Sequence, residues 1–289
     1  MFLCYYVVQI FKLRHYENAK PNQYLQLMTA KNSLLQLMKL ATLLLLTGSC
    51  NNQANENQTA PAISTEKLDT IKTNPYGPIA EPAIFEMSFF TGTKAKTDNF
   101  DISFFAVNIG EIGIESGKII ACDPIMMHQA LPFSQTFPTG KFPVQLAIAK
   151  IQMDERVAFS RILFSDKLVD RWRYALHRGE KEMSIFDTTF YGYNVDDGVG
   201  VFIDSTANYA FNSFSATDTS LRHKVFISEM DKHTRPTWQY AVYNFGTHNL
   251  AAFSTGLGDG SYATYIGLDK DGNVCRLLTD FGFVEWWKR

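Results

Sequence analysis

The chain has 289 residues, of which 46% are hydrophobic, and this length and composition suit one or two folded domains. Its 27 basic and 29 acidic residues nearly balance, so concentrated positive charge is absent and we expect no nucleic-acid partner. The 23 phenylalanines and 13 tyrosines favour strands, because aromatic side chains pack well on pleated, half-buried surfaces.

Residues 1–37 come before the first motif that can be interpreted. A targeting signal this far from the first residue is unusual, so we expect translation to begin at Met28 or Met38. The alternative is a genuine long leader. Under both interpretations we place this segment outside the folded domain.

Residues 38–49 predict a lipoprotein signal peptide. A lysine precedes a short apolar run, and small residues then lead to Cys50, which is the order found in secretory signals. The run is too short to span a bilayer, which needs about 20 apolar residues. The segment Leu46-Thr-Gly-Ser-Cys50 resembles a bacterial lipobox, so we expect lipidation of Cys50. The other interpretation is a buried helix over 33–47 whose cysteine is incidental.

Residues 50–75 predict a flexible tether. They are polar and of low complexity, and they lack the apolar side chains that offset the entropy lost on ordering. Asn51 differs from the aspartate that retains enterobacterial lipoproteins in the inner membrane, so we expect a protein anchored in the outer membrane of the cell envelope. The globular domain is expected at 76–289.

Two cysteines, Cys122 and Cys275, lie in this domain. In an oxidising compartment they either form a disulfide or remain two buried thiols on different strands. We favour the two thiols, because nothing in the sequence brings the residues together. No two cysteines have the spacing of zinc ligands, and no cofactor is expected.

The first half of the domain predicts antiparallel strands. Apolar runs on both sides of Ser116-Gly117 predict a hairpin within 99–122. A second hairpin is expected from strands at 142–151 and 156–164. From Ser165 or Asp166, an apolar spacing of three to four residues then predicts a helix through Leu176.

The second half continues this pattern of strands with inserted helices. The predicted strands are 186–193, 199–203, 239–243 and 249–254, the predicted helices are 205–214 and 221–230, and the glycine-rich stretch 256–281 reads as strand, hairpin turn and strand. Regular alternation of strand and helix is absent, so the predicted fold class is α+β. We expect a single domain of mainly antiparallel β hairpins with two or three inserted helices.

Several motifs occur in an order that resembles a known bacterial family. They are Ser116–Pro124, Pro138–Gly140, Asp196–Asp204, Gly256–Asp269 and Thr279–Phe281. Together they resemble the domain of unknown function 4241, over roughly residues 100–281, with Val199 where the resemblance would place a threonine. That family is uncharacterised, so the resemblance implies a fold and no activity.

Aspartates at strand ends and turns form the candidate site. Carboxylates that converge at one rim bind a hard cation or exchange protons. The alternative is that each aspartate caps its own turn through backbone N–H groups. The candidate site residues are Asp123, Asp197, Asp259, Asp280 and Tyr262, and Asp196 and Asp204 occupy similar positions.

Other motifs have simpler interpretations. The glycines at 256–260 lack the Lys-Ser/Thr of a phosphate loop. Residues 269–273 resemble the start of a calcium loop, but alternating strands on both sides favour a hairpin turn. An aspartate directly after Cys122 would raise the pKa of that thiol, which opposes its use as a nucleophile.

These observations leave two hypotheses. The first is a non-catalytic binding or envelope-accessory module, held at the membrane by its lipid anchor, that binds an unknown small molecule or protein. The alternative is a hydrolase, with or without a metal ion, that uses the rim of aspartates. No residue is assigned as catalytic or as a metal ligand.

Overall fold

The computed structural model describes residues 79–96, 100–187 and 189–287. The predicted leader, signal peptide and tether lie outside these residues, as does Cys50. None of the helices in the described ranges is long and apolar enough to cross a membrane.

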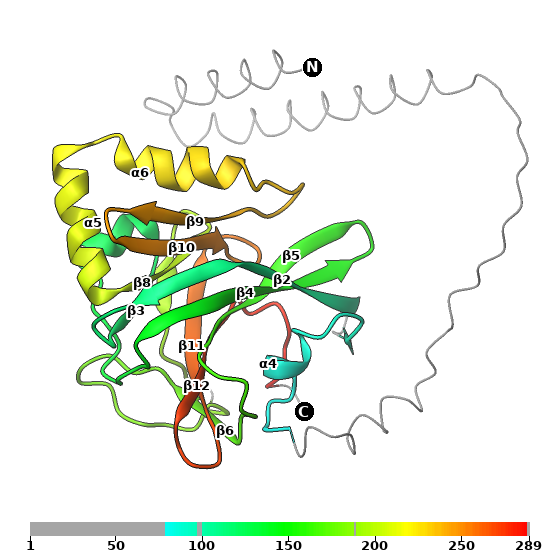
Figure 1. Ribbon diagram of the computed structural model, residues 1–289. Helices are drawn as coiled ribbons and strands as arrows, with labels where there is room; N and C mark the ends of the chain where they lie inside the picture. Colours follow the sequence, from blue (N-terminus) through cyan, green and yellow to red (C-terminus); the bar gives the residue numbers. More distant parts are fainter. Residues whose placement is uncertain (1–78, 97–99, 188, 288–289) are drawn as a thin grey trace, which may run out of the picture. The chain divides into compact units, whose positions relative to one another are not determined.

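The larger sheet, sheet A, has eight antiparallel strands (Figure 1). In spatial order they are β1 (Lys94–Lys96), β2 (Asp101–Ile114), β4 (Gly140–Ile151), β5 (Asp154–Leu163), β12 (Val274–Asp280), β11 (Gly260–Leu268) and β6 (Arg171–Tyr174), and β7 (Tyr193–Val195) pairs with the first residues of β11.

The smaller sheet, sheet B, has four antiparallel strands. Their order is β3 (Ile119–Cys122), β8 (Val199–Asp204), β10 (His248–Ser254) and β9 (Tyr240–Phe245). Helical elements pack on its outer face, as Figure 1 shows for α5 and α6. In the described part of the chain the helical elements are α4 (Ile84–Met87), the 3₁₀ helix η1 (Pro124–His128), α5 (Ser205–Thr217), and α6 (Leu221–His223), which continues into the π-helical segment η2 (Lys224–Glu229).

The core has three apolar layers, and strand alternation sorts the side chains among them. Phe202 of β8 and Phe253 of β10 face a cluster between the two sheets. Ile203 and Leu250, which pair with each other across β8 and β10, face the opposite way, toward the helices that cover sheet B. On its other face, sheet A buries Phe159 of β5 against Phe85 of α4. The fold is therefore α+β and mostly β, as predicted.

The predicted hairpin over 99–122 is wrong. β2 pairs with β1 and β4 in sheet A, whereas β3 pairs with β8 in sheet B. The chain turns at Ser116 and Gly117, where Gly117 has a φ of +69°, and it crosses there from one sheet to the other. The carboxylate of Asp204 holds this corner, because it accepts hydrogen bonds from the backbone of Glu115 and Ser116.

The predicted helix from Ser165 through Leu176 is also wrong. This segment contains β6, in which Trp172 and Tyr174 are buried while the alternating residues Arg171 and Arg173 are not. The apolar residues of this segment fit a spacing of three to four residues, but in the structure they alternate along a short strand. The predicted strand at 186–193 is wrong too. Among the described residues of that segment, only Tyr193, the first residue of β7, belongs to a strand.

The other predicted elements correspond to elements of the structure. The predicted helix 205–214 is α5, and 221–230 is the helical segment formed by α6 and η2. β4, β5, β8, β9, β10, β11 and β12 lie where strands were predicted. Cys122 on β3 and Cys275 on β12 are free, buried thiols, which confirms the favoured alternative to a disulfide.

Candidate functional site

Asp123 lies buried at the end of β3, where it joins two turns. Its Oδ1 accepts a hydrogen bond from the Ile125 backbone N–H at 2.6 Å and so caps η1. Its Oδ2 accepts from the backbone N–H groups of Asp196 and Asp197 at 2.7 and 3.0 Å. Both oxygens of this carboxylate are therefore occupied by backbone donors.

The turn between β7 and β8 meets the loop between β10 and β11. A Cβ placed on Gly198 would lie 3.5 Å from the Cα of Gly258, so the two backbones are in contact. Burial raises the pKa of Asp197, and the negative charges of Asp123 and Asp259 raise it further. Three turns thus bring four carboxylates, with Asp196 as the fourth, into one electrostatic environment.

Tyr262 is hydrogen-bonded to the loop between β10 and β11. Its ring is buried against Phe281, and its hydroxyl donates a hydrogen bond to the Gly258 carbonyl oxygen at 2.6 Å. Thr255 Oγ1 donates to the same oxygen at 2.8 Å. Two hydroxyl groups therefore fix the position of the loop, while Asp259 remains exposed at its tip.

The side chain of Asp280 lies on the opposite face of sheet A from Tyr262, although Asp280 pairs with the next residue, Ala263. Its Oδ2 accepts a hydrogen bond from Trp286 Nε1 at 2.6 Å, and its Oδ1 accepts one from the Gly282 backbone N–H at 2.8 Å. Burial raises the pKa of Asp280 to about 6. The groups that sense its charge are Tyr174 and Tyr265, on the face of sheet A that packs against α4.

Within the described ranges, no group of three or more His, Cys, Asp or Glu side chains is arranged to hold a metal ion. In the turn that resembles a calcium loop, the Lys167 ammonium contacts Asp269 Oδ2 at 2.8 Å and Asp271 Oδ2 at 3.0 Å. Asp269 Oδ1 also accepts from the backbone N–H groups of Asp271 and Asn273. These contacts make this segment the hairpin turn between β11 and β12.

The thiol beside Asp123 is not activated as a nucleophile. Burial, together with the charge of Asp123, raises the pKa of Cys122 to about 12. Thiolate, the reactive form, is therefore scarce at neutral pH.

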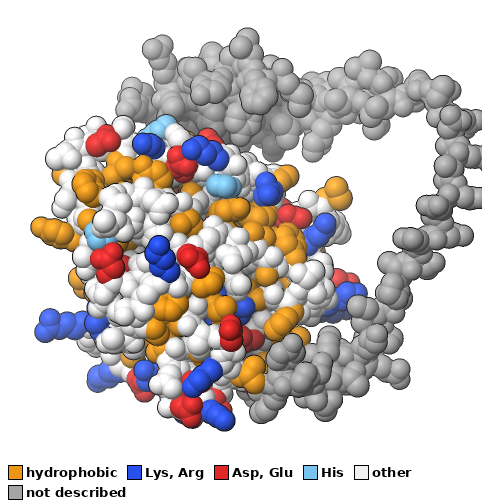
Figure 2. All heavy atoms as spheres, in the orientation of Figure 1, with side chains coloured by type: hydrophobic (Ala, Val, Ile, Leu, Met, Phe, Trp, Pro, Cys, Tyr) orange, Lys and Arg blue, Asp and Glu red, His pale blue; other side chains and the backbone are white. Residues whose placement is uncertain are grey.

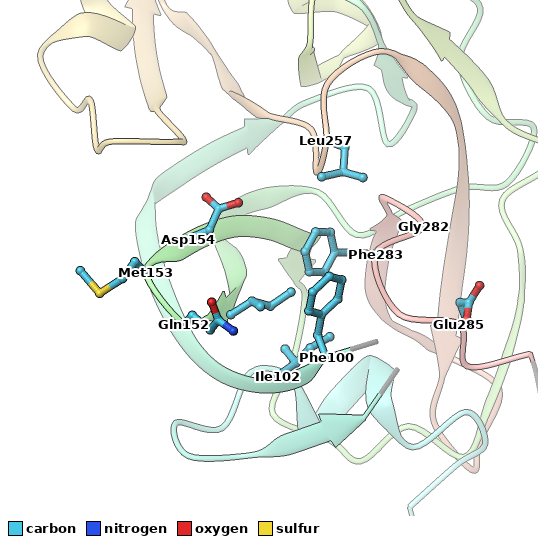
Figure 3. Close-up of a pocket in the computed structure, with 10 residues that line it drawn as sticks. Phe100, Ile102, Gln152, Met153, Asp154, Leu257, Gly282, Phe283 and Glu285 are labelled. Carbon is cyan, nitrogen blue, oxygen red and sulfur yellow. The ribbon is translucent and has the colours of Figure 1, made fainter. Parts of the chain in front are cut away.

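A feature that the sequence interpretation missed is a surface recess of about 660 Å³. It is lined by the start of β2, the β4–β5 turn, Leu257 of the β10–β11 loop and the segment after β12 (Figure 3). Figure 3 shows Leu257 reaching toward the rings of Phe100 and Phe283, while Met153 points outward. Met153 and Leu257 are 97% and 74% exposed, which is unusual for large apolar side chains.

One signal of this recess was present in the sequence. Met153 follows Gln152 in the tight turn between two strong strands, where polar residues are the rule. The partners that complete the recess come from segments distant in sequence, and only the fold brings them together. On the face seen in Figure 2, basic and acidic side chains are interspersed with apolar ones, and neither sign of charge forms a separate patch.

Comparisons with known proteins give one match. A family model described as "Protein of unknown function (DUF4241)" matches residues 112–279. The search of curated proteins and the search of solved structures gave no match. The matched segment extends from β2 to β12, so it contains the three acidic turns and the whole of sheet B. The chain belongs to the DUF4241 family.

Proposed function

We propose that this protein is a non-catalytic binding module of the bacterial cell envelope, anchored through a lipid on Cys50, whose ligand occupies the surface recess. The observation that carries this proposal is the recess itself. Its volume of about 660 Å³ lies within the range of small-molecule sites, and large apolar side chains line it. An apolar small molecule, or an apolar side chain of a partner protein, fits this chemistry.

The hydrogen bonds and pKa values of the buried Asp and Cys side chains support a role without catalysis. Asp123 and Asp280 bind backbone and indole N–H groups through both of their oxygens. Cys122 is a buried thiol with a raised pKa. Capping stabilises turns, and a carboxylate used in this way is poorly placed to exchange protons with a substrate.

A fluorescence titration with Nile red, a neutral apolar dye, tests the recess. We expect Leu257→Ser to weaken dye binding about tenfold, because it removes most of one apolar wall. Leu131→Ser is the matched control, since Leu131 is similarly exposed at 64% but does not line the recess. Equal effects of the two substitutions would show that the dye reports general surface apolarity, and the recess would lose its assignment.

The lipid anchor is tested separately by Cys50→Ala. We expect the wild-type chain to remain with membranes after washing in high salt, and the variant to be released in soluble form. Metabolic labelling with a fatty acid should mark the wild-type chain alone. A variant that stays in the membrane fraction, or a wild-type chain without label, contradicts the anchor and leaves the recess untouched.

The alternative, a hydrolase, is favoured by one observation at the acidic turns. The pKa of Asp197 is raised by burial and by the charges of Asp123 and Asp259, which is the direction that a general acid requires. Chromogenic esters, phosphate esters and glycosides would reveal such an activity. Turnover that Asp197→Asn abolishes in a folded protein would establish hydrolysis in place of simple binding, whereas turnover that survives the substitution would exclude Asp197 as its acid.

A further inference from the structure

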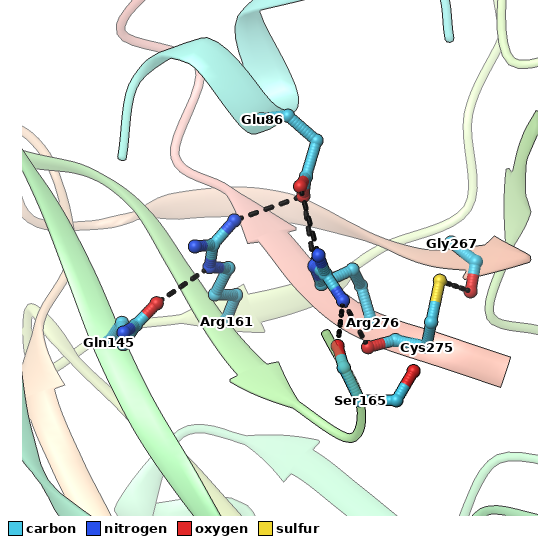
Figure 4. Close-up of polar contacts among 7 residues, drawn as sticks. All are labelled: Glu86, Gln145, Arg161, Ser165, Gly267, Cys275 and Arg276. Carbon is cyan, nitrogen blue, oxygen red and sulfur yellow. Dashed lines mark hydrogen bonds and ion pairs between the residues drawn. The ribbon is translucent and has the colours of Figure 1, made fainter. Parts of the chain in front are cut away.

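Two arginines and one glutamate form an almost fully buried cluster on the face of sheet A that packs against α4 (Figure 4). Glu86 of α4 accepts from Arg161 Nη1 of β5 at 3.0 Å. It also accepts from Arg276 Nε and Nη2 of β12, both at 3.1 Å. The side chains of Arg161, Arg276 and Glu86 are 10%, 6% and 14% exposed.

The cluster carries one positive charge in excess, because two guanidinium groups share a single carboxylate. Among the described residues, no other acidic side chain forms an ion pair with either arginine. A buried charge without an opposite charge is costly, since the protein interior screens and solvates it far less than water does. The cluster therefore has an electrostatic preference for one further anion.

Counting N–H groups shows where such an anion would bind. Arg276 is nearly saturated, because beyond Glu86 its Nη1 donates to the carbonyl oxygens of Ser165 and Cys275 at 2.6 and 2.9 Å. Arg161 is not. Its Nε donates to Gln145 Oε1 at 2.9 Å and its Nη1 to Glu86, which leaves three of its five N–H groups without an acceptor among the described residues.

The surroundings of Arg161 restrict the direction of approach. The Phe89 ring covers one face of the guanidinium, with Cζ 3.7 Å from the ring centroid. The remaining nitrogen, Nη2, points away from Arg276 in Figure 4. Nη2 has no acceptor among the described residues, yet it is not one of the fully enclosed polar atoms that lack a partner, so it keeps some exposed surface. The Nη2 edge is therefore the part of the guanidinium that an anion would approach.

We propose that Arg161 binds an oxyanion, the carboxylate or phosphate group of a ligand, at its Nη2 edge. Charge-assisted hydrogen bonds from a planar guanidinium suit both groups, and either one would cancel the excess charge. The lowered pKa of Arg161, about 10 with burial as its main cause, agrees with a guanidinium that lacks full compensation. This site is separate from the apolar recess and does not depend on the proposed function.

Titrations with sodium phosphate and sodium acetate, at an ionic strength held constant with sodium chloride, test the site in the full chain. Binding is followed by the amide and guanidinium NMR signals of Arg161 and by the denaturation midpoint. We expect saturable binding of at least one oxyanion, a rise of the midpoint with the same concentration dependence, and no such response to chloride alone. The oxyanion that binds more tightly identifies the ligand group.

Arg161→Lys keeps the charge and removes the planar donor edge, so we expect it to weaken the binding about tenfold. The matched control is Arg156→Lys on the same strand, whose arginine forms an ion pair with Asp154 at 2.9 Å. Circular dichroism establishes that both variants are folded. A response that does not saturate, or that Arg161→Lys leaves at the wild-type affinity, overturns the proposal.

Discussion

Asp280 is a buried carboxyl group whose protonation is coupled to folding. Its pKa rises from an ordinary value of 3.8 to about 6 in the folded protein, mainly through burial, while the N–H groups of Trp286 and Gly282 oppose the rise. The folded state therefore binds this proton more tightly than the unfolded state does. As pH increases from about 4 through about 6, the group should cost the folded state up to about 3 kcal/mol of stability.

Asp280→Asn tests this coupling, because it removes the titration and keeps the shape of the side chain. We expect the unfolding free energy of wild type, minus that of the variant, to fall by up to about 3 kcal/mol between pH 4 and pH 7 in urea titrations. Trp286→Phe removes the indole donor that lowers the folded-state pKa of Asp280, so the loss of stability in that background should extend to higher pH. A wild-type–Asn difference that stays constant with pH contradicts the assignment.

Two glycines with positive φ separate backbone strain from steric crowding. Gly256 has a φ of +43°, and an added Cβ would lie 2.9 Å from Phe281 Cβ and 3.0 Å from its carbonyl oxygen. Gly282 has a φ of +66° with nothing within 4 Å of an added Cβ. We expect Gly282→Ala to cost about 1 kcal/mol from strain alone. Gly256→Ala should cost roughly 1–3 kcal/mol more than this, because its methyl group would also overpack against Phe281. Urea unfolding measures both losses of stability, and equal losses for the two variants would contradict the steric part of the prediction.

Among the secondary-structure elements, Asp204 connects the start of α5 with the junction of β2 and β3, which is distant in sequence. Its Oδ1 accepts from the Thr206 backbone N–H at 2.8 Å and caps α5. Its Oδ2 accepts from the backbone N–H and the hydroxyl of Ser116, at 2.9 and 2.7 Å, where the chain passes from β2 to β3. One buried carboxylate therefore fixes both the start of a helix and the corner between the sheets.

Asp204→Ala should destabilise the protein by about 3 kcal/mol or more, because it removes a helix cap and leaves buried donors at the corner unpaired. Asp204→Asn keeps one acceptor oxygen, and its loss should be intermediate. Asp218→Ala removes a cap from an exposed turn at Ser220 and should have only a small effect. Urea unfolding of the three variants measures these losses. An Asp204→Ala variant as stable as the Asp218→Ala control would show that Asp204 does not stabilise the corner between the sheets.

The same corner shows which elements the sequence could predict. β4, β8 and β10 are long apolar or alternating runs, and their position follows from local pattern alone. Ser116-Gly117 indicates a turn, which is present, but its hairpin interpretation failed because the partner that directs the chain is Asp204, 88 residues away. β6 was missed because Arg171-Trp-Arg-Tyr174 is too short to distinguish period two from a helical period.

The candidate site was predictable to a similar extent. The turn positions of Asp123, Asp197 and Asp259 could be inferred from the strands beside them, and the structure brings these residues into one environment. The sequence could not indicate that Asp280 belongs to the opposite face of sheet A, because a strand pattern alone does not show which of its two faces meets sheet B. Nor could it show that the indole of Trp286 contacts Asp280. Nor could it show that Leu257 and Met153 line one recess, since they come from turns distant in sequence that only the fold brings to the same surface.

At the scale of the whole molecule, α4 and the segment after β12 pack against the face of sheet A opposite sheet B. Phe85 of α4 is fully buried among the rings of Phe159, Trp172, Tyr265 and Trp286, with centroids 4.9–5.7 Å away. Apolar burial alone does not fix the orientation of so short a helix, because it is non-directional. The ion pairs of Glu86 with two neighbouring strands supply that direction.

Glu86→Gln should therefore destabilise the folded protein by about 3–5 kcal/mol, because it leaves two buried guanidinium groups without an opposite charge. The control Glu182→Gln breaks an ion pair with Arg173 in which the glutamate is 70% exposed, so its cost should stay below about 1 kcal/mol. Urea unfolding measures both losses. Combining Glu86→Gln with Arg161→Met should recover part of the loss, since one excess charge is then removed from the interior. Without such recovery, packing of α4 rather than charge would account for the effect of Glu86.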